Sequence, residues 1–528
     1  MTPPARVSRR ALLVAPLAAP GLAAAQGSRV LRFVPQADVA VLDPIVTTAT
    51  ITSVHGYAIF DTLYATDAGY DVQPQMAAGH VIEDEGRRWT LTLREGLVFH
   101  DGEKVRARDC VASIRRWASR DNFGADLMAA TDELSAPDDR TIVFRLKRPF
   151  PLLSRALGKV TAPMPAMMPE RLATQDAPRG LSEMIGSGPW RFVPEERLSG
   201  ARLVYAKFDG YRPREGQASR TAGPKLVHFD RMEWNIIPDT STAAAALQRG
   251  EVDWLEAAGI DSIPLLKRSR DVVVTAVDDR SICVLRFNHL HPPFDNPGIR
   301  RALLGAVEQS DFMTAGYGED RSTWNDGIGT FLSGTPMASD AGLEPLRGRR
   351  DPEAVKRALA AAGYRGEKVV VLQANDYPTL RALAEVSADM LRKVGMTVDV
   401  VAADWGTVTQ RRGSREPVDK GGWSIFVTGV SGASVLDPVS HLALRANGPG
   451  AWFGWPDSPR LEALRRDWMA APDLATQQGL ARDIQRQAMQ DVPYIPLGEY
   501  ARVMAHRRNI TDIPTGQSLF WGVKKSGA

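Results

Sequence analysis

The chain has 528 residues, 44% of them hydrophobic and 24% charged, which is enough for two to four domains with ordinary cores. Basic residues exceed acidic residues by only three, so bulk charge argues against a nucleic-acid-binding protein. Two cysteines in a chain of this length exclude a fold that depends on a disulfide framework.

The N-terminal segment has the order of a secretory signal peptide. Three arginines precede an apolar run that begins at Ala11, and small residues lead to Ala25. The run is too short to span a bilayer, and no cysteine for a lipid anchor lies near its end. Residues 8–13, "SRRALL", resemble a twin-arginine export motif, with the general secretory route as the alternative. We therefore predict cleavage near Ala25 and a periplasmic protein without a membrane anchor, whose formal charge falls to zero once these arginines are removed.

Residues 88–146 alternate between strand and helix patterns. In "RRWTLTL", Trp89, Leu91 and Leu93 alternate with polar residues, which is typical of a half-buried strand. "KVRARDCVASIRRWASR" then has the spacing of an amphipathic helix, and "DDRTIVFRLKRPF" returns to a period of two. This part of the chain is therefore predicted to be α+β.

A later segment predicts a βαβ unit. It begins with the helix "DPEAVKRALAAAGY", which has Asp351 as its N-cap and Pro352 in its first position. Two buried strands follow, "EKVVVLQAN" and "TVDVVAAD", separated by the helix "PTLRALAEVSADMLRKV", which ends at Gly395. This spacing predicts parallel pairing of the strands, and ligands of such sheets bind beyond the carboxyl ends of the strands. Asp404 and Trp405 directly follow the second strand.

The chain contains none of the usual catalytic or nucleotide-binding motifs. GxxxxGK[ST], HExxH and CxxC are absent, and "GVSGA" at 429–433 lacks the second glycine of a GxSxG nucleophile elbow. His289 and His291 would share one face of a strand, but two histidines without a third ligand are weak evidence for a metal. A lone histidine such as His441 is usually structural or solvated. The sequence thus predicts no enzyme, no metal and no cofactor.

The two cysteines, Cys110 and Cys283, lie far apart in the sequence. We expect both to be buried free thiols, because free cysteine is among the most buried residue types. A disulfide between them, formed in an oxidising compartment, is the alternative.

Several segments in collinear order resemble the extracytoplasmic solute-binding proteins of bacterial peptide, oligopeptide and nickel ABC transporters. The most specific segment is "LREGLVFHDGEKVRARD", and "GSGPWRF", "ALQRGEVDW", "RFNHLHPPFDNPGIRRAL" and "AADWGT" follow it. The resemblance implies an α/β fold of two lobes, the type II periplasmic binding protein fold with the extra domain of the peptide-binding cluster. Its ligand cleft lies between the lobes. Domain I would comprise 28–50, 186–261 and 494–523, domain II 51–185, and domain III 262–493.

The same resemblance implies a function. The chain would be the periplasmic substrate-binding component of an ABC importer, a monomer that encloses a small solute by hinge closure. It would then deliver the solute to an inner-membrane ABC permease in a transient complex. The alternatives are an exported receptor or chaperone-like binding protein without a transport role and, with less support, an exported hydrolase.

Family roles can be transferred to particular residues. Thr47 and Thr48 match an early loop that reaches the ligand, although an ST-turn would explain them equally well. Trp405 matches an aromatic position of the cleft, with core packing as the alternative. Arg411 and Arg412 could clamp a carboxylate, or form a solvated pair.

The resemblance also points to residues further along the chain. Thr428 belongs to a segment that resembles the central strand facing the ligand, and Asn447 belongs to the segment after it. "AWFGWP" places Trp452, Phe453 and Trp455 beside a glycine and a proline, where no regular element requires them. We predict that these rings form a stacking wall of the cleft, with burial under the core as the alternative.

One departure from the family pattern bears on the ligand. Peptide-binding members carry an aspartate after the central strand, which pairs with the α-ammonium of the peptide. Here residues 428–436 contain no acidic residue, and the nearest is Asp437. A buried ammonium without a counter-charge costs on the order of several kcal/mol. The ligand is therefore expected to be a peptide-like compound that is not held by an ion pair to its α-ammonium, or another amphipathic or aromatic compound.

Overall fold

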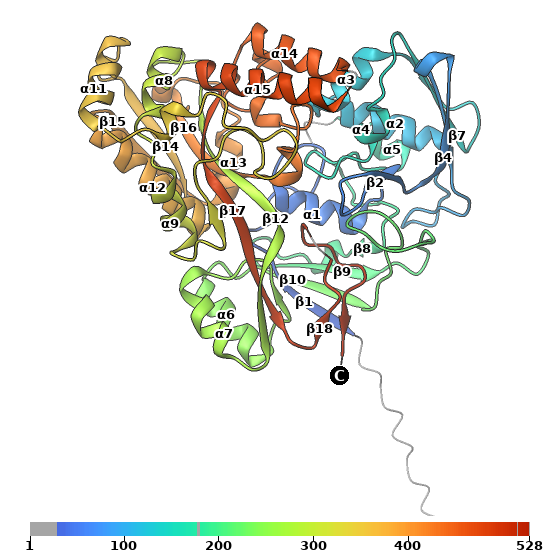
Figure 1. Ribbon diagram of the computed structural model, residues 1–528. Coiled ribbons are helices and arrows are strands. Elements are labelled where there is room, and N and C mark those ends of the chain that lie inside the picture. Colours follow the sequence, from blue (N-terminus) through green and yellow to red (C-terminus); the bar gives the residue numbers. More distant parts are fainter. Residues whose placement is uncertain (1–28, 177–179, 472, 515, 527–528) are drawn as a thin grey trace, which may run out of the picture.

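The computed structural model describes residues 29–176, 180–471, 473–514 and 516–526, without the side chains at 278 and 279. The predicted signal peptide lies outside the described residues. Figure 1 shows three groups of elements: one around α11, α12 and β14 at the upper left, one around α2 and β4 at the upper right, and one around β1 and α6 at the bottom.

One sheet of eleven strands connects the upper-left and lower groups. The strand order is β15-β14-β16-β12-β17-β11-β1-β10-β9-β8, and β13 pairs with β17 outside this path. In this order the strands are Thr397–Ala403, Lys368–Ala374, Ile425–Ser431, Val272–Phe287, Tyr494–Arg507, Trp254–Leu255, Val30–Val34, Arg231–Asn235, Arg202–Lys207 and Trp190–Phe192, with β13 at Trp324–Asn325.

The long strands β12 and β17 join the two halves of this sheet. They are antiparallel neighbours, and β12 pairs on its other side with β16 from Ser281 to Phe287. β17 pairs with β11 at Ala505. The register between β12 and β17 shifts between Ala276 and Arg280, which interrupts the ladder between the two halves.

The predicted βαβ unit is confirmed. β14 and β15 are parallel along their full length, and α12 (Pro378–Lys393) connects them. The preceding helix α11 (Pro352–Ala361) begins where the capping residues predicted, because the Asp351 side chain accepts a hydrogen bond from the amide of Ala354 at 3.0 Å. Gly395 follows α12 with φ +83°, a conformation that favours glycine at a helix end.

The remaining helices pack around the sheet in Figure 1. On the lower group they are α6 (Thr240–Arg249) and α7 (Ile263–Arg268). On the upper-left group they are α8 (Pro297–Leu304), α9 (Gln309–Tyr317), α10 (Glu344–Arg347), α13 (Trp405–Arg411), α14 (Pro459–Ala470) and α15 (Leu474–Asp491). The short strands β18 (Ile510–Thr511) and β19 (Lys524–Lys525) pair near the C-terminus.

The upper-right group is the α+β region that the sequence predicts. Its four strands have the order β4-β5-β7-β6, with bounds Ala77–Glu83, Arg88–Leu93, Thr141–Leu146 and Thr131–Ser135. The predicted helix is α2 (Ala107–Ala118). The other elements of the region are α1 (Thr50–Ile59), α3 (Asn122–Ala130), α4 (Leu153–Leu157), α5 (Glu170–Ala173), β2 (Tyr64–Thr66) and β3 (Val72–Pro74).

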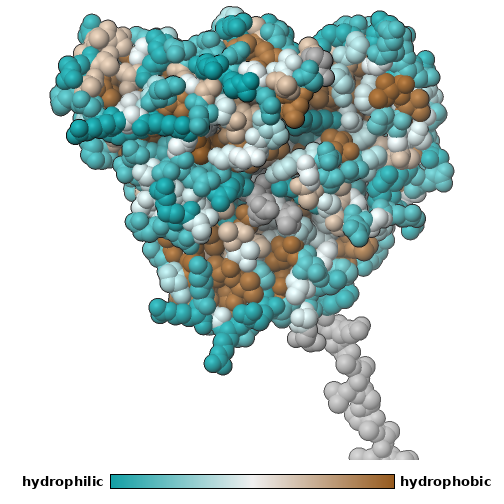
Figure 2. All heavy atoms as spheres, in the orientation of Figure 1, coloured by the Kyte–Doolittle hydropathy of each residue, from teal (hydrophilic) through white to brown (hydrophobic). Residues whose placement is uncertain are grey.

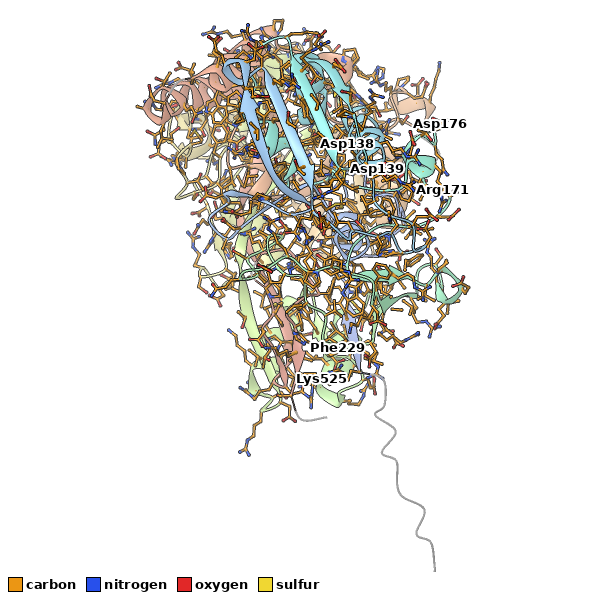
Figure 3. All side chains as sticks on the ribbon, turned by 90° about the vertical axis from the view of Figure 1, so that its right-hand side faces the viewer. Asp138, Asp139, Arg171, Asp176, Phe229 and Lys525 are labelled. Atoms are coloured by element: carbon orange, nitrogen blue, oxygen red, sulfur yellow. The ribbon has the colours of Figure 1, made fainter. Side chains whose placement is uncertain are left out.

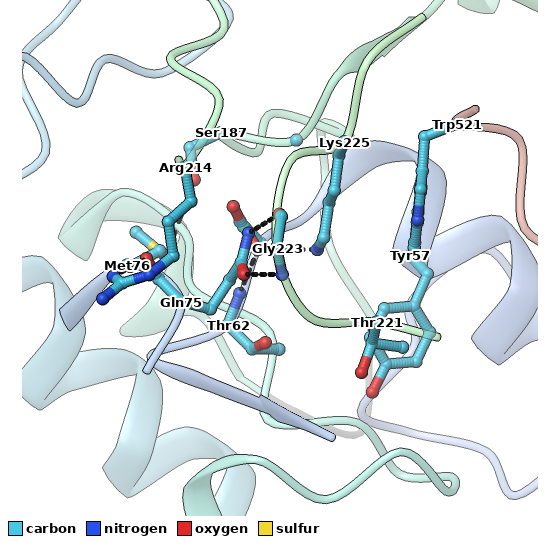
Figure 4. A network of polar contacts seen from close by, with 12 residues as sticks. Tyr57, Thr62, Gln75, Met76, Ser187, Arg214, Thr221, Gly223, Lys225 and Trp521 are labelled. Carbon is cyan, nitrogen blue, oxygen red and sulfur yellow. Dashed lines mark hydrogen bonds and ion pairs between the residues drawn. The ribbon is translucent and has the colours of Figure 1, made fainter. Parts of the chain in front are cut away.

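A buried polar network ties this region to the segment around residue 223 (Figure 4). The Lys225 ammonium lies 2.7 Å from the Asp61 carboxylate, and both side chains are almost fully buried. The Gln75 amide both accepts from the Gly223 amide, at 3.1 Å, and donates to the Gly223 carbonyl, at 3.2 Å. The buried side chains of Asp61, Gln75 and Lys225 are therefore paired with one another or with the main chain.

Both cysteines are free and buried, as predicted. Cys110 lies on α2 and Cys283 on β12. Burial raises the pKa of the Cys283 thiol to about 12, so the thiol stays protonated at neutral pH.

Figure 2 shows a mostly hydrophilic face with apolar patches low in the view, around α6 and α7, where Leu265 is exposed. The turned view in Figure 3 places Arg171 on the α+β region and Lys525 at the opposite end of the molecule. Arg171 pairs with Asp101 at 3.0 Å, and Lys525 with Asp253 at 2.7 Å. Within the described ranges, no helix has the length and apolar character to cross a membrane.

Candidate functional site

A cavity with about 100 Å³ of space for water-sized molecules lies between the two halves of the large sheet. One wall comes from the loop after β1 and from the C-terminal segment, and the other from the ends of β15 and β16 and their loops. This is where the βαβ pattern predicted a ligand, beyond the carboxyl ends of parallel strands.

Trp405 stands in the wall at the start of α13. The Asp404 side chain caps this helix by accepting a hydrogen bond from the Thr407 amide at 2.9 Å, which fixes the turn between β15 and the helix. The Trp405 ring is 8% exposed and packs edge-on against Tyr377, with ring centroids 5.9 Å apart. Trp405 therefore packs against the core and lines the cavity at once.

Arg412, at the C-terminal end of α13, brings a positive charge to the cavity. It is 2% exposed, and burial lowers its pKa to about 10, so the guanidinium remains charged at neutral pH. One Nη donates to the Thr48 hydroxyl at 3.2 Å, and Nε has no hydrogen-bond partner. Among the side chains that the structure describes, no carboxylate pairs with Arg412.

Aromatic rings surround this guanidinium. Its carbon lies 4.8 Å from the ring centroid of Phe453, 5.6 Å from those of Trp405 and Phe426, and 5.7 Å from that of Trp452. Ring faces attract a cation, but they do not neutralise its charge. A positive charge without a described counter-charge therefore faces the cavity.

β16 ends at the cavity through Thr428, Gly429 and Ser431. A Cβ at position 429 would lie 2.4 Å from the hydroxyl of Tyr500, so only glycine lets the tyrosine approach the strand. Tyr500 also lines the cavity and stacks on Tyr317, with centroids 4.2 Å apart.

The segment "AWFGWP" divides its rings between two environments. Trp452 lines the cavity, and its Nε1 donates to the Thr48 hydroxyl at 3.2 Å. Trp455 turns the other way: it is 6% exposed and packs on Trp423 with centroids 6.2 Å apart. Phe453 packs against Arg412 and does not line the cavity.

The structure brings five of the predicted residues together in the cavity wall: Thr48, Trp405, Arg412, Thr428 and Trp452. The other five lie outside this wall: Thr47, Arg411, Asn447, Phe453 and Trp455.

Three of these five have local roles. The Thr47 hydroxyl accepts from the Ala49 amide at 3.2 Å, which is the ST-turn alternative. Arg411 donates to the Gly422 carbonyl at 3.0 Å, and the exposed Asn447 forms an isolated bridge with Asp457.

Sequence reasoning missed much of the wall. Gln36, Arg220, Tyr377, Tyr500, Arg502 and Gln517 also line the cavity. They come from loops and strands far apart in the chain, and no local pattern distinguishes them from surface residues. Arg502 pairs with Glu256 at 3.1 Å, so its charge is balanced within the protein, unlike that of Arg412.

Asp437, the acid nearest to β16, is engaged elsewhere. It is 3% exposed, forms an ion pair with Arg155 and accepts from the amides of Val439 and Ser440 at 2.9 and 3.0 Å. It does not line the cavity, and neither does any other carboxylate whose side chain is described.

The histidines noted in the sequence lie in separate environments. His289 is near the Pro493 carbonyl and His291 near that of Arg415. His441 is buried between Tyr494 and the Thr330 carbonyl, at 2.8 and 3.0 Å, and burial lowers its pKa to about 3. No cluster of three metal-ligating side chains occurs in the described part of the chain.

The family model of the bacterial extracellular solute-binding proteins, family 5, matches residues 71–451. The chain belongs to this family. Over 534 aligned residues it is 35% identical to a probable peptide ABC transporter periplasmic-binding protein, y4tO, of Sinorhizobium fredii. That alignment covers 98% of this chain and 100% of the relative. Family 5 proteins bind solutes in the periplasm and supply an ABC permease.

Solved structures of family 5 proteins show the same two-lobed α/β fold. The peptide-binding DppA of Helicobacter pylori, in complex with the peptide STSA, has a TM-score of 0.79 at 21% identity, over 94% of this chain and 98% of that one. AgaA of A. tumefaciens R10, in complex with agropinic acid, has a TM-score of 0.78 at 19% identity, over 94% and 99%. The resemblance to the solute-binding family and its fold is thus confirmed.

Proposed function

We propose that this family 5 protein captures a solute with an acidic group, which binds Arg412 between the lobes, and delivers it to an ABC permease. The observation that carries the proposal is a buried guanidinium that faces a cavity and lacks a carboxylate partner among the described side chains. Burial of a charge is costly unless the charge is paired. A ligand carboxylate would supply the missing partner and could take two hydrogen bonds from the guanidinium.

The surroundings of Arg412 favour an acid over a peptide held by its α-ammonium. The wall around Arg412 lacks a described carboxylate for an ammonium, and Asp437 is already paired with Arg155. Asp38, Asp376 and Asp404 line a neighbouring cavity that shares Tyr377 and Trp405 with this one. The AgaA structure, in complex with agropinic acid, shows that this fold accommodates an acid. The wall formed by Trp405 and Trp452 suits a ligand that also has a flat or apolar face.

The proposed capture mechanism is closure of the lobes about β12 and β17, with the domain boundaries expected from the sequence. Three side-chain hydrogen bonds support closure across the cavity. The Tyr377 hydroxyl donates to the Gln36 side chain at 2.9 Å, and Thr48 accepts from both Arg412 and Trp452. Closure excludes water from the solute, which strengthens each polar contact inside. The protein acts in this proposal as a monomer and has no catalytic role.

The test is native mass spectrometry of the protein purified from its own periplasm, followed by calorimetric titration with the retained compound. We expect an acidic compound that raises the melting temperature by linkage. Small-angle scattering should show a more compact protein at saturation. A retained ligand without an acidic group would contradict the assignment of Arg412, and unchanged dimensions at saturation would contradict lobe closure.

For localisation, we propose export through the twin-arginine route. Replacing Arg9 and Arg10 with lysines should leave the precursor in the cytoplasm, because that route requires the arginine pair. Immunoblots of cytoplasmic and periplasmic fractions measure the distribution. A normal periplasmic yield of the double variant would assign the chain to the general secretory route instead.

A further inference from the structure

The second buried arginine of this region is Arg286, on β12. It is fully buried and donates four hydrogen bonds, all to main-chain carbonyls. Nε reaches the Phe453 carbonyl at 2.7 Å and Nη2 the Trp452 carbonyl at 3.2 Å. Nη1 donates to the carbonyls of Ala443 and Pro493, at 2.7 and 2.9 Å. In the described part of the chain, no carboxylate pairs with Arg286.

These bonds hold a segment that has little regular structure of its own. Residues 451–456 lie outside any helix or strand. The segment approaches β12 so closely that a Cβ at Gly454 would lie 2.1 Å from the Phe287 carbonyl oxygen. The Gly454 carbonyl accepts from the His289 amide at 2.8 Å, which adds a main-chain contact to the two from Arg286.

The same segment supplies two of the four rings around Arg412, those of Trp452 and Phe453. The Arg286 guanidinium lies 5.2 Å from the Trp452 ring, and that of Arg412 lies 5.7 Å from the same ring. The hydrogen bonds to the carbonyls of Trp452 and Phe453 therefore fix the main chain from which both side chains extend. Those side chains in turn border the guanidinium that faces the cavity.

We propose that Arg286 is a positioning residue for the ligand site: it orients Trp452 and Phe453 through their carbonyls and has no contact with the solute. The proposal rests on the proposed function in that Trp452 then forms part of the solute-binding wall. Lysine is a poor substitute here, because its ammonium is a point charge and lacks the planar fork that reaches two consecutive carbonyls.

The test compares Arg286→Met and Arg286→Lys with the control Arg300→Met. Arg300 is also buried and donates to main-chain carbonyls, those of Phe294 and Asp491, but it does not contact the ring segment. Proteins labelled with 5-fluorotryptophan are observed by fluorine NMR, and Trp452→Phe assigns the resonance of Trp452. Hydrogen exchange of residues 447–458 is measured in parallel. Neither readout needs a ligand, so failure of this proposal is distinguishable from failure of the acid-binding proposal.

We expect both Arg286 variants to shift or broaden the Trp452 resonance and to accelerate exchange in 447–458 about tenfold or more, since hydrogen bonds from a charged donor are lost. Arg300→Met should lower the melting temperature while leaving both signals as in the wild type. If Arg286→Met does not fold, Arg286→Lys decides the outcome. An unmoved Trp452 resonance in either folded variant, or an equal change in the control, would overturn the proposal.

Discussion

Replacing Arg412 with methionine is expected to weaken binding of the acidic solute by about a hundredfold. Truncating one partner of a buried, hydrogen-bonded charge pair costs roughly 2–5 kcal/mol, and about 1.4 kcal/mol corresponds to a factor of ten. The ligand-free protein should melt at the same temperature or higher, because an apolar side chain of similar size replaces a buried cation without a described counter-charge. Calorimetric titration and thermal melts measure the two effects.

Arg411→Met is the matched control for this experiment. Arg411 is the neighbouring arginine, but it donates to the Gly422 carbonyl and does not line the cavity. Its replacement should leave the affinity within about twofold, since Arg411 does not line the cavity. Equal losses of affinity in both variants would argue against a specific role for Arg412.

Trp452→Ala should lower the ligand affinity, whereas Trp455→Ala should lower the stability of the fold, although the two residues are only three positions apart. Trp452 faces the cavity, and stacking on an aromatic ring is worth roughly 1–3 kcal/mol, so its loss should weaken binding about tenfold or more. Trp455 packs in the core against Trp423, and its truncation should cost roughly 3–5 kcal/mol of unfolding free energy. The affinity per folded molecule of the Trp455 variant should barely change.

Trp405→Ala provides the comparison, because Trp405 reaches the cavity from a different element, α13. It should weaken binding and also lower stability, since its ring is 8% exposed and packs on Tyr377. A Trp452 variant that loses stability but keeps its affinity would place that ring in the core. This result would support burial of the rings under the core instead of a stacking wall.

The regular elements near the site were predictable because their signals are local. Capping by Asp351 and the glycine that follows α12 mark helix ends, and strand–helix–strand spacing implies parallel pairing. That pairing places Trp405 at the carboxyl edge of the sheet without any knowledge of the ligand.

The shape of the cavity wall was less predictable. Gln36 and Tyr377 meet only because the lobes fold together, and they are 341 positions apart in the sequence. The division between Trp452 and Trp455 depends on positive φ angles at Gly454 and Trp455, +97° and +48°, which turn the chain between the rings. Periodic patterns of apolar residues do not reveal such a turn, so the prediction from the sequence placed all three rings in one wall.

The two hydrogen bonds that converge on Thr48 also bear on the protonation state of the solute. A hydroxyl oxygen has two lone pairs, and here the Arg412 and Trp452 donors account for both. The remaining capacity of Thr48 is its own O–H, a donor, and the unpartnered Nε–H of Arg412 is a donor as well. Under our proposal, this corner of the cavity offers only hydrogen-bond donors. An ionised carboxylate, which only accepts hydrogen bonds, therefore binds there better than the neutral acid, whose O–H is a further donor. Capture of a weak acid would then decline as the surroundings become more acidic than the pKa of the solute, while Arg412, with a pKa of about 10, stays charged.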